Sequence, residues 1–290
     1  LYQTLIGAWP FEQQDPESWS EFVERIKAYM LKATREAKVN TSWINPVADY
    51  DTAVQDFVRD VLTPARNGKF LQDFAAFHKK VAHFGVFNSL SQTLLKLTSP
   101  GVPDLYQGNE IWDFSLVDPD NRRPVDFGKR SEMLEGLRRR IRERGADLAA
   151  LASGLVKTKE DGRIKLYVTH RTLIHRRENK ELFSSGSYVP LEVAGGKKDH
   201  ACAFARKYES QCVIVIVPRL VCKLTGGAMV APQGFDVWEG TWVIIPADLG
   251  RTFRNVFTGE TVETVKQAGN QVLMLGTAFS SFPLVLLEGL

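Results

Sequence analysis

The chain has 290 residues, of which 44% are hydrophobic and 24% are charged, and its net charge is +3 at pH 7. This composition is typical of a globular protein with one large or two medium domains. The longest apolar runs, such as 213–217, are too short to cross a membrane. The basic run at 138–140 is flanked by acids, which favours a solvated helix face over a nucleic-acid surface. We therefore expect neither a membrane nor a nucleic acid as partner.

Residues 1–183 are predicted to be mainly helical. Residues 1–10 are apolar but lack a basic segment and a long apolar core, so we expect the interior of a longer chain rather than a signal peptide. Asp15 followed by Pro16 marks the start of a helix, in which apolar residues recur at helical spacing to about Lys38. The same spacing predicts further helices: one capped by Asp49 and reaching Val61, and others over 70–84, 89–97, 131–151 and 164–181.

A short apolar segment at 102–108 interrupts the helices and leads into a polar stretch. This pattern predicts a buried strand with a functional loop at its C-terminal end. Residues 104–127 contain six carboxylates, two asparagines, a glutamine, two adjacent arginines, a tyrosine and a tryptophan. Such side chains bind sugars, because aromatic faces stack on sugar rings and polar groups hold the hydroxyls. A structural loop remains the alternative, with turn-capping aspartates paired to the arginines: Asp118, Asp120, Arg122 and Arg123.

Residues 184–290 are predicted to form an antiparallel β-domain, as a sandwich. Glycines and prolines separate short β-rich runs at 201–206, 212–218, 237–245, 252–257, 260–265 and 282–287. Trp238 and Trp242 are predicted to alternate along one strand face, where they either pack on the sheet or stack on a glucan. The three cysteines have no Cys or His partner at metal-ligand spacing, which indicates reduced thiols of a cytoplasmic protein and no metal site.

Several stretches resemble known carbohydrate enzymes. Residues 101–110, Gly-Val-Pro-Asp-Leu-Tyr-Gln-Gly-Asn-Glu, resemble the eighth barrel strand and following loop of the α-amylase family, and residues 118–124 resemble the segment that follows. Residues 32–46 and 88–98, taken together with 101–124, are similar to maltooligosyl trehalose synthases. The similarity extends to 1–10, 162–171 and 199–206, so it covers nearly the whole chain.

This resemblance implies an α+β fold. Residues 1–183 would be the C-terminal, mostly helical part of a (β/α)8 barrel, and residues 184–290 the β-domain. It also implies an enzyme that converts the reducing-end α-1,4 bond of a maltooligosaccharide into an α,α-1,1 bond without a cofactor. The partners would be the maltooligosaccharide and the remainder of the barrel. Two alternatives stay open: part of an α-1,4-glucan hydrolase of the amylase family, or a non-catalytic glucan-binding module.

The resemblance gives substrate contacts but no catalytic residue. The family uses an aspartate nucleophile, a glutamate acid and base, and a third carboxylate in a His-Asp motif. The sequence contains no Gly-x-Arg-x-Asp and no histidine followed by aspartate, so this segment is expected to be inactive by itself. Glu110 and Asp118 match a loop that faces the substrate. The predicted sugar contacts are Tyr106, Gln107, Glu110, Asp118, Asn121, Arg122 and Arg123, with Lys38 and Trp43 as a second group.

Overall fold

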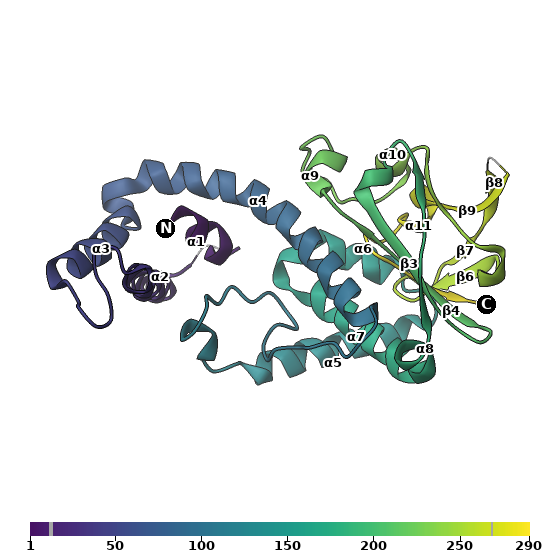
Figure 1. Ribbon diagram of the computed structural model, residues 1–290, viewed down its shortest axis with the longest axis horizontal. Coiled ribbons are helices and arrows are strands. Elements are labelled where there is room, and N and C mark those ends of the chain that lie inside the picture. Colours follow the sequence, from purple (N-terminus) through teal and green to yellow (C-terminus); the bar gives the residue numbers. More distant parts are fainter. Residues whose placement is uncertain (12–13, 268) are drawn as a thin grey trace. The chain divides into compact units, whose positions relative to one another are not determined.

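The computed structural model describes residues 1–11, 14–267 and 269–290. Within these ranges the chain divides into two compact units, each with its own hydrophobic core. Unit 1 comprises Leu1–His83 and Asp113–Val125, and unit 2 comprises Phe84–Trp112 and Asp126–Leu290. Among the described residues, the β-strands begin with β1 at Ser187, and helices predominate before it (Figure 1).

Unit 1 is built from α1 (Tyr2–Ala8), α2 (Pro16–Ala37), α3 (Ala48–Val61) and the N-terminal part of α4 (Pro64–Thr98). The predicted start of α2 is confirmed, because the Asp15 carboxylate accepts a hydrogen bond from the Ser18 backbone N–H at 2.8 Å. The predicted cap of α3 is wrong. Val47 occupies the cap position. Asp49 lies in the first turn, where its negative charge interacts favourably with the positive end of the helix dipole. The core of unit 1 is made of Leu5, Ala8, Phe22, Ile26, Val58, Leu62 and Phe74.

The two helices predicted over 70–84 and 89–97 are one continuous helix, α4. Its backbone departs from helical geometry only at Asn67 among the described residues. No proline lies between 65 and 98, and a single glycine inside a helix, such as Gly85, costs only about 1 kcal/mol relative to alanine. The backbone hydrogen bonds therefore continue through the predicted break, and α4 contributes to both units.

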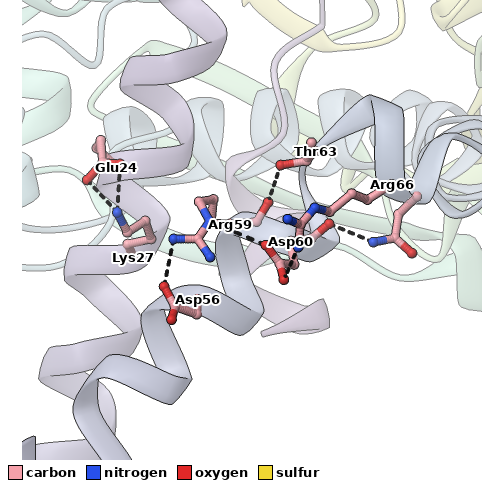
Figure 2. A network of polar contacts seen from close by, with 8 residues as sticks. Glu24, Lys27, Asp56, Arg59, Asp60, Thr63 and Arg66 are labelled. Carbon is pink, nitrogen blue, oxygen red and sulfur yellow. Dashed lines mark hydrogen bonds and ion pairs between the residues drawn. The ribbon is translucent and has the colours of Figure 1, made fainter. Parts of the chain in front are cut away.

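A network of polar contacts lies on the surface of unit 1 around the end of α3 (Figure 2). Arg59 pairs with Asp56 at 2.7 Å and with Asp60 at 3.3 Å, while Arg66 pairs with Asp60 at 2.6 Å. Thr63 donates a hydrogen bond to the Arg59 carbonyl at 2.7 Å. Because the charges are solvent-exposed and already paired, we assign this network to the turn between α3 and α4 rather than to a ligand.

The helical part of unit 2 contains the C-terminal part of α4 with α5 (Phe127–Arg144), α6 (Ala149–Lys157), α7 (Arg163–Glu178) and α8 (Lys180–Ser184). The helix predicted over 131–151 is instead two helices. Gly145 adopts a positive φ of 60° and ends α5. The helix predicted over 164–181 is also divided, because α7 ends at Glu178 and α8 begins at Lys180.

The strand predicted over 102–108 is wrong. The segment has neither helical nor strand structure, and the Val102 side chain is 96% exposed. A strand needs a neighbour with which its backbone N–H and C=O groups can pair. None of the strands in the described residues pairs with this segment. An apolar run therefore lies on the surface as an irregular loop.

The strands of unit 2 form two antiparallel sheets in the described part of the chain, which confirms the predicted antiparallel arrangement. The first has the order β1 (Ser187–Pro190), β3 (Ala201–Tyr208), β4 (Gln211–Pro218), β10 (Val285–Gly289), β6 (Thr252–Asn255) and β7 (Thr261–Glu263). The second has the order β2 (Val193–Gly195), β5 (Thr241–Ile244), β9 (Asn270–Met274) and β8 (Val265–Gln267). Short helices connect strands along the chain: α9 (Val221–Leu224) and α10 (Phe235–Trp238) between β4 and β5, and α11 (Leu275–Ala278) between β9 and β10.

The two sheets share one hydrophobic core. Ile214 and Ile216 of β4 belong to the same buried cluster as Val243 of β5 and Leu273 of β9. The alternate residues of β4, such as Val215, are buried as well, so both faces of this strand are covered. Burial on both faces explains why β4 reads in the sequence as a continuous apolar run rather than an alternating one.

Arg206 of β3 is buried in unit 2, with only 1% of its surface exposed. Its guanidinium donates hydrogen bonds to backbone carbonyl oxygens of Thr98 at 3.2 Å, Phe183 at 3.1 Å, Gly186 at 2.7 Å and Ser187 at 3.3 Å. Burial, with repulsion from Arg176, lowers the pKa of Arg206. Arg176 itself donates to the Leu97 carbonyl at 3.0 Å, so two cations satisfy the C-terminal end of α4.

Trp238 does not lie on a strand face as predicted. It belongs to α10, is buried, stacks on Phe279 with a centroid distance of 4.9 Å, and donates through Nε1 to the Pro232 carbonyl at 2.9 Å. Glycine at 240 ends this turn with a φ of 60°, so the strand starts only at Thr241. The stacked, buried ring makes Trp238 a core residue and excludes it as a glucan contact.

Replacing Trp238 by phenylalanine should lower the free energy of unfolding by about 1–2 kcal/mol, because the stack is retained while the Pro232 carbonyl loses its donor. Urea denaturation followed by circular dichroism measures this change. Trp242 of β5 is partly exposed, and Trp242→Phe serves as the matched control, with an expected change below about 0.5 kcal/mol. Equal losses in the two variants would contradict the assignment.

Candidate functional site

One face of α2 anchors the loop at 113–125 of unit 1. Arg25 donates through Nε and Nη2 to the two carboxylate oxygens of Asp120, both at 2.8 Å, and through Nη2 to the Phe114 carbonyl at 3.0 Å. Lys32, seven residues further along α2, donates to the Asp118 carbonyl. A spacing of seven residues is about two helical turns, so both side chains leave the same face of the helix.

Asp120 is the internal anchor of this loop. Its side chain is 11% exposed, and besides Arg25 it accepts a hydrogen bond from the Leu116 backbone N–H at 2.6 Å. Burial by itself would raise the pKa of this carboxyl, but the hydrogen bonds and the charge of Arg25 outweigh burial and lower it. Asp120 therefore stays ionised at neutral pH and holds the loop in place.

The predicted sugar contacts on this loop lie outside that anchor, around the short 3-10 turn Asp120–Arg122. The Arg122 side chain is 73% exposed and forms an ion pair with the half-exposed Asp118. Arg123 is also exposed, and it donates to the Ser115 hydroxyl at 3.2 Å and to Asp120 at 3.1 Å. Asn121 has a buried Oδ1 without a hydrogen-bond partner among the described residues. The ion pairs expected of a structural loop are thus present, between Asp118 and Arg122 and between Asp120 and Arg123. Exposed polar groups lie beside them.

The second predicted group lies in the loop that follows α2. Lys38 ends the helix in the left-handed conformation, with φ of 57°. The Trp43 side chain is 56% exposed, and the Arg35 guanidinium carbon lies 4.9 Å from the centre of its ring. Arg35 is held by the buried Asp51 of α3, at 3.0 Å from Nε and 2.7 Å from Nη2, and these hydrogen bonds lower the pKa of Asp51. The indole ring is therefore presented to solvent by a fixed support.

The loop at 38–47 is ordered by its own hydrogen bonds. The Ser42 N–H donates to the Asn45 carbonyl at 3.2 Å, and the Asn45 N–H donates to the Ser42 hydroxyl at 2.9 Å. Buried Thr41 accepts from the Val47 N–H at 3.1 Å. Ile44, at the tip, is 87% exposed. The loop therefore keeps a defined shape while its apolar side chains face outward.

Unit 1 brings these two loops to neighbouring turns of α2. Lys32, which holds the loop at 113–125, and Arg35, which supports Trp43, are three residues apart on the helix. This separation corresponds to a rise of about 4.5 Å. The sequence did not identify Arg25, Lys32 and Arg35 as the residues that position the site. Their recurrence on one side of α2 was the available signal.

Tyr106, Gln107 and Glu110 lie in unit 2, on the loop that precedes α5. Tyr106 and Gln107 are exposed, and Glu110 accepts from Arg130 Nε at 3.3 Å. Arg130 also donates to the Gly108 carbonyl at 2.5 Å, so the first turns of α5 hold this loop. The predicted site residues are thus divided between the two units, three in unit 2 and the others in unit 1.

Among the described residues, no group of three or more His, Cys, Asp or Glu side chains is arranged to hold a metal ion. In the same residues, no helix combines the length and apolar character needed to span a bilayer.

Comparison with known proteins identifies relatives in sequence and in fold. No family model matches the chain. A putative maltooligosyl trehalose synthase of Mycobacterium tuberculosis strain CDC 1551 / Oshkosh is 34% identical over 224 residues, which are 77% of this chain and 25% of the relative. The chain thus spans about a quarter of the length of the curated relatives it matches.

Solved structures agree with this relationship. The maltooligosyltrehalose synthase of Arthrobacter ramosus superposes with a TM-score of 0.72 and 30% identity, over 99% of this chain and 31% of that protein. A hypothetical maltooligosyl trehalose synthase of Sulfolobus tokodaii superposes with a TM-score of 0.65 and 30% identity, over 99% and 31% of the two chains. The chain is therefore related, in sequence and in fold, to the C-terminal portion of maltooligosyl trehalose synthases.

Proposed function

We propose that this chain supplies part of the sugar-binding surface of an enzyme that converts the reducing-end α-1,4 bond of a maltooligosaccharide into an α,α-1,1 bond. The observation that carries the proposal is the pair of loops held on neighbouring turns of α2. One loop exposes Trp43, and the other exposes Asp118 with Arg122. A sugar-binding site needs both an apolar surface and hydrogen-bonding groups. The reaction is proposed from the relatives, which are named maltooligosyl trehalose synthase.

Each predicted contact has a role in this proposal. The Trp43 ring stacks on the face of a glucosyl unit, and Lys38 donates to a hydroxyl at the edge of the same loop. Four residues of the second loop bind sugar hydroxyls: Asp118, Asn121, Arg122 and Arg123. Their hydrogen bonds to the sugar replace part of the ion pairs present without it. Tyr106, Gln107 and Glu110 belong to unit 2 and are proposed as sugar-binding groups of that unit by themselves.

The bond rearrangement requires carboxylates that we do not assign to this chain. In the proposed arrangement, residues 1–183 complete a (β/α)8 barrel whose remaining part carries the nucleophile and the acid, and residues 184–290 form the β-domain. The enzyme is proposed to be cytoplasmic and to need no cofactor. The released glucose must turn and re-attack before water does, so well-anchored loops over the sugar favour transfer over hydrolysis.

The test is a maltopentaose assay on the longer protein that contains this chain, with the trehalosyl product as readout. Trp43→Ala should lower kcat/KM about tenfold, mainly through KM, because a stacking surface for the sugar is lost. Phe57 on α3 is equally exposed, 55% against 56%, so Phe57→Ala is the matched control and should leave kcat/KM unchanged.

Other outcomes would contradict the proposal. Equal effects of the two substitutions would remove Trp43 from the site. Glucose and shorter maltodextrins as the main products would favour an α-1,4-glucan hydrolase. Retention of the longer protein on a glucan gel without any turnover would favour a non-catalytic binding module.

A further inference from the structure

A cavity of about 190 Å³ lies within unit 2, between the turn after α5, helix α7 and the strands β6 and β10. None of its lining residues is among those assigned above to sugar contact. Pockets for drug-sized ligands are larger, about 300–1,000 Å³, so this cavity suits a ligand the size of one sugar ring.

The charges around the cavity are balanced. Arg171 of α7 and Arg254 of β6 face Glu178 of α7 and Glu288 of β10, and Arg254 forms an ion pair with Glu288. A free anion would meet two carboxylates and a free cation would meet two guanidinium groups, and either would remain partly uncompensated. A neutral ligand that both donates and accepts hydrogen bonds fits this set of groups.

His175 lines the cavity with a buried ring. Its side chain is 5% exposed, its Nδ1 lies 3.4 Å from Glu288, and its Nε2 has no hydrogen-bond partner among the described residues. Burial lowers the pKa of His175 more than Glu288 and Glu178 raise it, so the ring is neutral at pH 7. Nδ1 also lies 3.4 Å from the Asn179 amide nitrogen, and Nε2 is closed off from solvent. The His175 ring therefore shapes the wall of the cavity as a neutral group, and we assign it no hydrogen bond to a ligand.

Donors and an apolar surface complete the cavity. Arg171 uses Nε and Nη2 to bind the Val256 carbonyl at 3.1 and 2.9 Å, while its Nη1 makes no hydrogen bond within the described chain. Leu148, Ile174 and Val256 line the same space with apolar side chains. Sugars present C–H groups on one face and hydroxyls at the rim, so they match a site that combines these surfaces.

We propose that this cavity is a carbohydrate site that holds one neutral glucosyl unit, with Arg171 donating to its hydroxyls and Glu178 accepting from them. The site lies in unit 2 alone and goes beyond the function proposed above. It gives the chain a binding activity of its own, without any contribution from the loops of unit 1.

Isothermal titration of the 290-residue chain with maltose tests the proposal, in a Trp43→Ala background that removes the sugar contact proposed for unit 1. Glu178→Gln removes a charged acceptor and should raise Kd about tenfold. Ile174→Phe fills the cavity and should abolish the binding. Glu181→Gln on α8 changes an equally exposed carboxylate outside the cavity and should leave Kd unchanged. Circular dichroism melting curves of each variant verify that the fold is intact, so a loss of binding reflects the cavity itself.

The alternatives give different results. Because each titrated protein carries Trp43→Ala, binding to the cavity is measured without the proposed stack in unit 1, and the two proposals fail independently. Saturable binding that persists after Ile174→Phe is added to Trp43→Ala would overturn the cavity site. Tighter binding of glucose 6-phosphate than of maltose would make it an anion site, and no saturable binding at millimolar maltose would also overturn it.

Discussion

Replacing Arg206 by methionine should lower the free energy of unfolding by about 3–5 kcal/mol. The buried guanidinium binds the carbonyls of Thr98, Phe183 and Gly186, which come from α4, α8 and the start of β1. Methionine fills a similar volume but donates nothing, so these carbonyls lose their partner in a region from which water is excluded. Chemical denaturation followed by circular dichroism measures the loss.

Two control variants make this result specific. Arg206→Lys keeps the charge but has a single nitrogen that cannot reach carbonyls on three segments, so it should recover less than half of the loss. Arg177→Met removes an exposed arginine of α7 and should change stability by less than about 0.5 kcal/mol. A loss in Arg206→Met no larger than in Arg177→Met would show that Arg206 does not join the helices to the sheet.

Replacing Asp120 by asparagine should lower the free energy of unfolding of unit 1 by about 2–3 kcal/mol at pH 7. The neutral amide offers one oxygen where the carboxylate offers two, and its NH₂ group would face the donors of Arg25. The loop at 113–125 then loses its bidentate anchor to α2. Asp118→Asn, in the same loop but half-exposed, is the matched control and should cost less than about 1 kcal/mol.

The pH dependence of the Asp120→Asn effect follows from the direction of the pKa shift. Because the pKa of Asp120 is lower in the folded protein than its ordinary value of 3.8, the carboxylate contributes its stability above that value and loses it as the pH falls through the folded pKa. The difference between wild type and Asp120→Asn should therefore be constant above about pH 5 and shrink below about pH 4. A difference that grows in acid would contradict the anchoring role.

Local signals predicted much of the secondary structure, and the failures have physical causes. The Asp15 cap and the apolar spacing of α2 act within a few residues, so the sequence contains the whole signal. The continuity of α4 follows from the absence of a proline and from the low cost of a single glycine at 85, so the break predicted there has no strong local cause. The segment at 102–108 has strand-like residues but no strand beside it, and pairing cannot be inferred from one segment by itself.

The candidate site was predictable only in its exposed part. Trp43, Arg122 and the polar loop residues stand out by composition and by resemblance. The residues that hold them do not, because Arg25 and Asp120 are 95 positions apart and Lys32 and Asp118 are 86 apart. A hydrogen bond between such distant residues leaves no periodic pattern in the sequence. That the nine predicted residues bind sugar remains a prediction.

The support under Trp43 has an entropic consequence for any ligand that stacks on it. Fixing a mobile side chain on binding costs about 0.5–1.5 kcal/mol, and ordering a mobile loop costs more. In unit 1 the stack on Arg35, the Arg35–Asp51 ion pair and the turn at Ser42 impose that order when the chain folds. The indole is thus preorganised, and a sugar would gain the contact without losing binding free energy to immobilise the loop.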